Sequence, residues 1–598
     1  MTRSQASIRF PVSCLLLALL PYSVSAQAPD PHFQFKGAST CKGCHSIPLF
    51  SAEFVSLNES TRWKNRDKHS MAVRLLVGMS RSTDGRIAIE PDKRENAIGL
   101  NMFAKLEVLS AKDLEEAVAR GEELNPKLSD AQDRMQSALE AYLKARLAAL
   151  TGADNADEID ALDSKVRDAE EEVKSIEHEY MQPLIDICLK SEIGRGCLSC
   201  HADLPKDGFS DKVDAASFAA ESIRDGVSCE ACHGPSSQWL DPHYRTDWRG
   251  KSPTDKVAMG LNDLRHPAVR ANQCYSCHIG DVKQGKFIEH SWYMAGHPPL
   301  PSIEVETFAH DMPRHWRYLK EKTAFKKSAD HAKFVAAVKG DKTNPFEIDS
   351  QFPQTKEVLV GGVVALRKST ALLADAHARD PKIIIPDFAA FDCQACHQEL
   401  RSKPILTRDE NKFDPYVPGR PNIPRWSFAL ADIAVDLSGG NRKAFEGAIN
   451  DWRESLSRQP FGDRQQVGPA AEALAGIMKS LETKISQDET TAERAKETQA
   501  ALTKILTNEL LDFHSARQLV WALQVVANET GEAIPAGLKY PAEKDELSSI
   551  GTYLQIRLPA GATTLITDDK NLPQLLARID AYDPEKFRSL MQEILAKP

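Results

Sequence analysis

The unit Cys-x-x-Cys-His occurs five times in this chain of 598 residues, and a histidine directly follows every Cys-x-x-Cys pair in it. Histidine makes up only 17 of the 598 residues, so chance would almost never place one after all five pairs. Whatever the chain folds into must bring two thiols and an imidazole together at each unit. The five units are Cys41/Cys44/His45, Cys197/Cys200/His201, Cys229/Cys232/His233, Cys274/Cys277/His278 and Cys393/Cys396/His397.

Two thiols three positions apart can add to the two vinyl groups of one porphyrin, and the adjacent imidazole then binds the iron from one face. A Cys-x-x-Cys pair can also be half of a zinc site or a redox dithiol, but those sites would not need a trailing histidine at every pair. The sequence therefore predicts five covalently bound haem c groups, with zinc ribbons as the alternative. The predicted proximal iron ligands are His45, His201, His233, His278 and His397.

The first 26 residues have the features of a secretory signal peptide. Arg3 and Arg9 supply positive charge, residues 14–20 are apolar apart from Cys14, and residues 24–26 suit cleavage before Gln27. The apolar run is too short to span a bilayer, and no uninterrupted apolar stretch of about 18 residues follows it. We expect an exported, periplasmic protein that is soluble after signal cleavage, with no membrane span in the mature chain.

The net charge of −10 argues against nucleic acid as a partner, and haem propionates would add further negative charge. Redox partner proteins such as other cytochromes fit better, and the sequence leaves an oligomer open. The two cysteines outside the motifs are explained otherwise. Cys14 leaves with the signal peptide, and Cys188 lies in an apolar helical run where a buried, inert thiol is expected.

Residues 128–190 are predicted to form an antiparallel coiled-coil hairpin. Apolar residues step by three and four along residues 128–149 and again along residues 159–180, and a Gly-, Asn- and Asp-containing turn separates the two arms. A self-contained hairpin can bury its own seam. A structural insertion is therefore favoured over a role in dimerisation or in docking a partner.

The predicted fold class is mainly α, a multihaem cytochrome c with sparse regular structure around stacked haems. Residues 27–127 form the region of haem 1, and residues 191–426 carry haems 2–5, whose faces replace much of the side-chain packing. Residues 427–598 contain no cysteine and have helical spacing, so they are predicted to form a haem-free helical domain.

The order of motifs resembles that of the cytochrome c-554 family of tetrahaem cytochromes. The first unit is followed by Trp63-x5-His69-Ser70, then by the second unit, by Gly-Val-Ser-Cys-Glu-Ala-Cys-His-Gly-Pro at residues 226–235 with His243, and by the fourth unit. The resemblance covers residues 41–278 without the hairpin. It implies periplasmic electron transfer, notably from hydroxylamine oxidation, by a mostly helical protein with haems stacked in close pairs.

The resemblance also implies ligands on the second face of the irons. His69 would bind the third haem and His243 the first, while the second haem, attached at His201, would be five-coordinate. The chain departs from the family in its hairpin, its fifth haem unit, its C-terminal domain and a histidine-rich segment at residues 290–315.

Residues 289–298 offer ligands for haems 4 and 5. His290 and His297 lie seven positions apart, close to two helical turns, so they could share a helix face and serve neighbouring irons. Further candidates are His310, His315, His377 and, as a thioether, Met294. We expect no iron ligand at His32, His178, His331 and His514.

The predicted function is a periplasmic pentahaem cytochrome that transfers electrons between redox partners through mostly bis-histidine haems. The sequence favours a carrier but leaves the enzyme question open. The alternative is an oxidoreductase that reduces or oxidises a small nitrogen or sulfur compound at an open haem 2 iron. A third hypothesis is an assembly subunit docked through the hairpin and the C-terminal domain.

Overall fold

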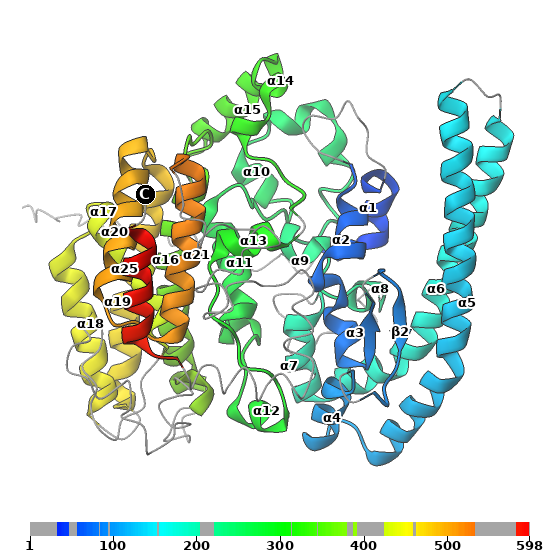
Figure 1. Ribbon diagram of the computed structural model, residues 1–598, viewed down its shortest axis with the longest axis horizontal. Coiled ribbons are helices and arrows are strands. Elements are labelled where there is room, and N and C mark those ends of the chain that lie inside the picture. Colours follow the sequence, from blue (N-terminus) through cyan, green and yellow to red (C-terminus); the bar gives the residue numbers. More distant parts are fainter. Residues whose placement is uncertain are drawn as a thin grey trace, which may run out of the picture.

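The structure is a computed structural model that describes residues 33–46, 57–203, 220–379, 387–391, 424–532 and 582–596, apart from residues 83, 94–95, 152–154, 313, 344 and 459–461. The predicted signal peptide and the fifth unit, with His397, lie outside the described residues. The described part is mainly helical, as predicted. Figure 1 shows the hairpin at one end, the C-terminal helices at the other, and the motif-bearing elements between them.

Two long antiparallel helices form the predicted hairpin, α5 (Ala111–Leu150) and α6 (Ala156–Lys190). Helix α5 begins before residue 128, because Ser110 and Asp113 form a capping box at its N-terminus. Several of the predicted seam residues are buried between the two helices. They include Leu128, Ala131 and Ala145 on α5 and Ala169, Val173, Ile176 and Tyr180 on α6.

The base of the hairpin shares a core with the N-terminal region. Strands β1 (Met79–Arg81) and β2 (Ile87–Ile89) form an antiparallel pair with Met79 opposite Ile89, and β2 packs on α5. Tyr180 of α6 is fully buried, and its hydroxyl donates to the backbone oxygen of Val77. The N-terminal helical elements are α1 (Ala38–His45), α2 (Glu59–Arg66), η1 (Lys68–Met71), α3 (Ala72–Leu76) and α4 (Ile98–Lys105).

Between the hairpin and residue 352 the described part of the chain forms short helices joined by irregular segments. The prediction of sparse regular structure covered residues 191–426, and that range also contains the long helix α16 (Pro353–Arg379). The short helices are α7 (Glu192–His201), α8 (Ala220–Arg224), α9 (Cys229–His233), η3 (Pro242–Tyr244), η4 (Thr246–Gly250), α10 (Pro253–Val257), α11 (Pro267–His278), η5 (Val282–Gln284), α12 (His290–Ala295), α13 (Val305–Asp311), η6 (Leu319–Glu321), α14 (Thr323–Lys326) and α15 (Ala329–Gly340).

The C-terminal helices form a bundle around α16 (Pro353–Arg379), which precedes the predicted domain boundary at residue 427. Helix α16 packs closely against α17, since a Cβ atom on Gly362 would lie 2.3 Å from Cβ of Leu430. Helices α19, α20 and α21 lie within residues 427–598, where helical structure was predicted. The remaining elements are η7 (Phe388–Ala390), α17 (Trp426–Leu437), α18 (Arg442–Ser457), α19 (Arg464–Gln487), α20 (Ala492–Asn508), α21 (Phe513–Thr530) and α25 (Pro584–Leu595).

Among the helices that the structure describes, none has the length and apolar character needed to cross a bilayer.

Candidate haem-binding site

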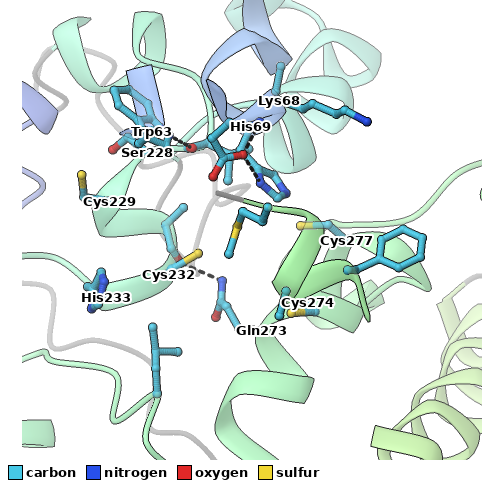
Figure 2. A pocket seen from close by; sticks show the side chains of 18 of the residues that line it. Trp63, Lys68, His69, Ser228, Cys229, Cys232, His233, Gln273, Cys274 and Cys277 are labelled. Atoms are coloured by element: carbon cyan, nitrogen blue, oxygen red, sulfur yellow. Dashed lines mark hydrogen bonds and ion pairs between the residues drawn. The ribbon is translucent and has the colours of Figure 1, made fainter. Parts of the chain in front are cut away.

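One cavity of about 2580 Å³ is lined by both cysteines and the histidine of every described Cys-x-x-Cys-His unit. A pocket for a single small ligand usually measures roughly 300–1,000 Å³, so this cavity has room for several large groups. Figure 2 shows part of it, with Cys229, Cys232 and His233 on one side and Cys274 and Cys277 on the other.

Each described unit occupies the end of a helix. Helices α1, α7, α9 and α11 all terminate at the histidine of their unit. In such a turn, residues i, i+3 and i+4 lie on one face, so both thiols and the imidazole point the same way. This local geometry lets one planar group be attached and ligated at each helix end.

The run at residues 226–235 needs its two glycines. Gly226 has φ +76°, and a Cβ atom there would lie 2.9 Å from the backbone oxygen of His69, which accepts from Val227 N at 3.1 Å. Gly234 has φ +85°, and its Cβ would lie 2.1 Å from the backbone oxygen of Gly260. Both glycines therefore permit backbone approaches beside the cavity that a side chain would block.

Glu230, between the two cysteines of the third unit, is 1% exposed and ties the first and third units together. Its carboxylate accepts hydrogen bonds from the backbone N–H groups of Lys36, Gly37 and Ser236, the last two at 2.7 Å. Lys36 and Gly37 directly precede α1. The sequence signal for this role is the position of Glu230 inside the third unit, but its partners at residues 36–37 are nearly 200 residues away and no local pattern points to them.

The histidine of each described unit faces a second histidine from a distant part of the chain. The ring centres lie 6.3 Å apart for His45 and His243, for His69 and His278, and for His233 and His315, and 6.4 Å apart for His201 and His297. A metal–imidazole bond of about 2.0–2.1 Å, with about 1.1 Å from ring nitrogen to ring centre, places two ligands of one metal with centres roughly 6.2–6.4 Å apart. All four pairs have this spacing.

These pairs differ in part from what the resemblance implied. His243 does face His45, the histidine of the first unit. His69 faces His278 of the fourth unit, and His315 takes the place opposite His233. His201 of the second unit has His297 opposite it, so its iron position is flanked on both sides.

His290 and His297 do not share a helix face. Helix α12 ends at Ala295, and Gly296 with φ +125° turns the chain before His297. His290 instead lies near η7, where its backbone N–H donates to Oδ1 of Asp387 at 2.8 Å and its ring contacts Phe388.

The other candidate ligands are not brought to the four described units. Met294 is 75% exposed, and His310 lies on an exposed position of α13. The side chain of His377 lies outside the described residues.

Hydrogen bonds at Nδ1 orient several of the paired rings and leave Nε2 free. His45 and His69 donate to carboxylates, of Glu59 and Asp67 respectively, each at 2.9 Å. Three further rings donate to backbone oxygens. His201 donates to that of Ala72 at 2.9 Å, His297 to that of Pro298 at 2.7 Å, and His243 to that of Leu240. Partners of this kind fix the tautomer and orientation of metal-binding histidines.

The pKa values of the paired histidines depend on whether a carboxylate lies beside the ring. Burial lowers the pKa of His233, His278 and His297 to about 4, so these imidazoles are neutral near pH 7, the form that binds a metal. The hydrogen bond with Glu59 raises the pKa of His45. Burial opposes the same effect of Asp67 on His69, but the net pKa shift is still upward.

The cavity wall is strongly basic, although the whole chain is acidic. It contains ten lysine and arginine residues but only three carboxylates, Glu59, Asp67 and Asp263. Burial lowers the pKa of Lys256 and of Lys322 to about 8, with help from neighbouring cations. Since each haem carries two propionates, this excess of cations fits a group of haems. The basic residues are Arg66, Lys68, Arg81, Arg249, Lys256, Arg265, Arg270, Lys286, Arg317 and Lys322.

A zinc site would instead need three or four protein ligands around one point. Within the described part of the chain, no group of three His, Cys, Asp or Glu side chains is arranged to hold a metal ion. The four described units thus lack the geometry of zinc ribbons and fit a ligand that supplies the remaining coordination itself, as a porphyrin does.

Contacts between units connect the sites. The Cys41 thiol lies within hydrogen-bonding reach of Cys229, and that of Cys200 within reach of Cys277. Units 3 and 4 are joined by Gln273, whose Nε2 donates to the backbone oxygen of Ala231 at 2.7 Å (Figure 2). The attachment sites therefore follow one another in the spatial order 1, 3, 4, 2.

A comparison with protein families finds one match, to the family described as cytochrome c554 and c-prime, at residues 157–234. The match contains units 2 and 3 and also includes α6 from near its start, which the resemblance had left out. Searches of curated proteins and of solved structures give no match. The family match supports a c-type cytochrome with covalently bound haem and a role in electron transfer.

Proposed function

We propose that the protein is an exported pentahaem c-type cytochrome that passes electrons between redox partner proteins. The observation that carries this proposal is the set of four histidine pairs whose ring centres lie 6.3–6.4 Å apart across one cavity. When bound, each haem supplies a one-electron redox centre.

Each described haem would be held by the two cysteines of its unit and by two histidines. The pairs are His45 with His243 for haem 1, His201 with His297 for haem 2, His233 with His315 for haem 3, and His278 with His69 for haem 4. An iron with two imidazole ligands has no position left for a substrate. This arrangement suits electron transfer better than turnover of a small molecule.

The alternative, a reductase or oxidase of a nitrogen or sulfur compound, depended on an open iron at haem 2. The position of His297 opposite His201 argues against that vacancy. No specific feature of the described cavity favours the enzyme over the carrier.

The order of the attachment sites supports a relay. The contacts of Cys41 with Cys229, of Gln273 with Ala231, and of Cys200 with Cys277 place neighbouring units close together. Covalent attachment at such sites would hold the haems at fixed separations, which rapid electron transfer requires. In this proposal haems 1 and 2 lie at the two ends of the row of four.

The fifth haem would be attached at Cys393, Cys396 and His397. We assign His290 as its second ligand, because Asp387 and Phe388, a few residues before the unit, contact it. Haem 5 would then lie next to haem 2, since Trp292 of the same helix α12 packs against Gly196 of α7.

The proposal is tested first by counting haems. The mature holoprotein, exported from a host with the c-type maturation pathway, should contain five haem c groups per chain by pyridine haemochrome absorbance and by intact mass. A variant with Cys393 and Cys396 both changed to Ala should contain four. A wild-type protein with four or fewer haems would contradict the pentahaem assignment.

A further inference from the structure

The outer part of the hairpin carries a stripe of exposed leucines on α5. Leu139, Leu143 and Leu147 are 40%, 56% and 64% exposed, and their spacing of four places them along one side of the helix. The described part of the chain has only four other exposed large hydrophobic side chains, none of them on the hairpin. Isolated exposed leucines are ordinary, but three in a row on one surface indicate a contact.

The stripe is not part of the hairpin's own seam. Ala131 and Ala145, which are buried, mark the side of α5 that faces α6. At 100° per residue, Leu143 points about 160° away from Ala145 around the helix. The leucines therefore face away from α6. Figure 1 shows the hairpin at one end of the molecule, remote from the C-terminal bundle.

We propose that this stripe joins two copies of the chain, with α5 packed antiparallel to α5 of a second molecule about a twofold axis at Leu143. Such a contact requires a surface that matches itself. The axis places Leu143 opposite its own copy and brings Leu139 level with Leu147 of the partner subunit.

The charges beside the stripe also match under this symmetry. Glu140 and Lys144 lie on the same flank of the leucines, about 60° and 100° from Leu143 around the helix. In the antiparallel pair, residues on that flank meet the same flank of the other copy. Glu140 then lies next to the partner's Lys144, and Lys144 next to the partner's Glu140.

The charge of α6, the second helix of the hairpin, explains why α5 and not α6 makes the contact. Residues 157–172 of α6 contain eight acidic and two basic residues, so two copies of this surface would repel each other. Residues 136–150 of α5 contain one acidic and two basic residues. Within the hairpin, this segment of α5 therefore opposes the approach of a second copy less than residues 157–172 of α6 do.

The contact between copies is short. Residues 139–147 extend over about 12 Å of helix, and a stable interface buries about 800 Å² on each partner. The dimer should therefore form and dissociate with protein concentration. This inference does not depend on the proposed electron transfer.

Sedimentation velocity of the mature holoprotein over a range of concentrations tests the proposal. The wild type should shift from monomer to dimer as concentration rises, and Leu143→Glu should remain monomeric. Val257→Glu removes an exposed apolar side chain outside the hairpin and should leave the dimer unchanged. A monomeric wild type at the highest soluble concentration would overturn the proposal, as would a Leu143→Glu protein that still dimerises.

Charge reversal tests the register. Glu140→Lys puts two lysines on the flank and Lys144→Glu puts two glutamates there, so each variant alone should dimerise less than the wild type. An equimolar mixture of the two should recover dimer, because each copy then offers the charge that the other lacks. Recovery would distinguish a contact between copies from a pair within one helix, and a mixture that stays monomeric would refute the antiparallel arrangement. Haem absorbance and circular dichroism confirm that each variant is folded.

Discussion

The imidazole rings of His201 and His297 face each other with centres 6.4 Å apart and planes at 89°. Ninety-five residues separate them in the sequence, and each ring is oriented by a backbone oxygen that accepts from its Nδ1. The second haem unit, which the resemblance left with an open iron, thus has the same arrangement as the other three described units.

The angles between paired rings predict distinct low-spin signals. His45 and His243 lie nearly parallel, at 19°, whereas the rings of the pairs His201–His297 and His69–His278 are perpendicular, at 89°. Parallel axial imidazoles give ferric haem a rhombic low-spin spectrum, and perpendicular ones give a strongly anisotropic signal at low field. Electron paramagnetic resonance of the oxidised protein should show both, and His243→Met should remove rhombic intensity. If His243→Met left the rhombic signal intact, the pairing at haem 1 would be wrong.

Asp67 should hold the reduction potential of haem 4 low. Its carboxylate accepts from Nδ1 of His69, which makes that imidazole a stronger donor and favours ferric iron. Asp67→Asn should raise one midpoint potential by tens of millivolts in an optical redox titration. Asp84→Asn, at a fully exposed carboxylate, should change none. Identical titrations for wild type and Asp67→Asn would contradict this role.

The backbone at Gly234 should tolerate no side chain. Alanine there would place Cβ 2.1 Å from a backbone oxygen at a positive φ, whereas a Cβ on Gly250 would meet nothing within 4 Å. Strain of this kind costs about 1–3 kcal/mol before the clash is added. Gly234→Ala should therefore sharply reduce the yield of holoprotein measured by Soret absorbance, while Gly250→Ala should leave it near wild type. Equal yields would show that the close approach to Gly260 is dispensable.

Stability should fall as pH rises from about 4.5 to 7 because of Glu304. Burial raises the pKa of this carboxyl group to about 7. Below the unfolded pKa near 4.5 both states bind the proton, so the stabilising contribution is fully present there. Between the unfolded and the folded pKa only the folded state keeps the proton on Glu304. The stabilising contribution, on the order of a few kcal/mol, is lost as the pH rises through the folded pKa.

The variant Glu304→Gln mimics the neutral group and tests this pH dependence. Denaturant midpoints measured across that range should decline less steeply for Glu304→Gln than for the wild type. Equal slopes would exclude Glu304 as the cause.

Local patterns in the sequence predicted the helical character of the chain well. The stepping of apolar residues in the hairpin and the helical spacing within residues 427–598 both depend on neighbours within one or two helical turns. The structure bears out the helical character that these patterns predicted. The start of α5 was missed although Leu114, Ala117 and Leu124 continue the stepping of three and four back from residue 128. Pro126 lies inside this helix, and a proline ordinarily marks a helix end.

The histidine pairs could not be predicted in this way, because each joins residues far apart in the chain. No local spacing links His69 to His278 or His233 to His315. The spacing of seven between His290 and His297 suggested a shared helix face, but Gly296 ends the helix between them. The carboxylates of Glu59 and Asp67 were likewise found only through the fold, although Asp67 stands two residues from His69.

In the proposed arrangement His297 would be the second iron ligand of haem 2, and the spin state of the iron tests this assignment most directly. Electron paramagnetic resonance of the oxidised wild-type holoprotein should show low-spin ferric haem without a high-spin signal. His297→Ala should convert one haem to high spin, while His310→Ala, at an exposed histidine of α13, should convert none. A wild-type protein that already contains one high-spin haem, unchanged in His297→Ala, would contradict the account.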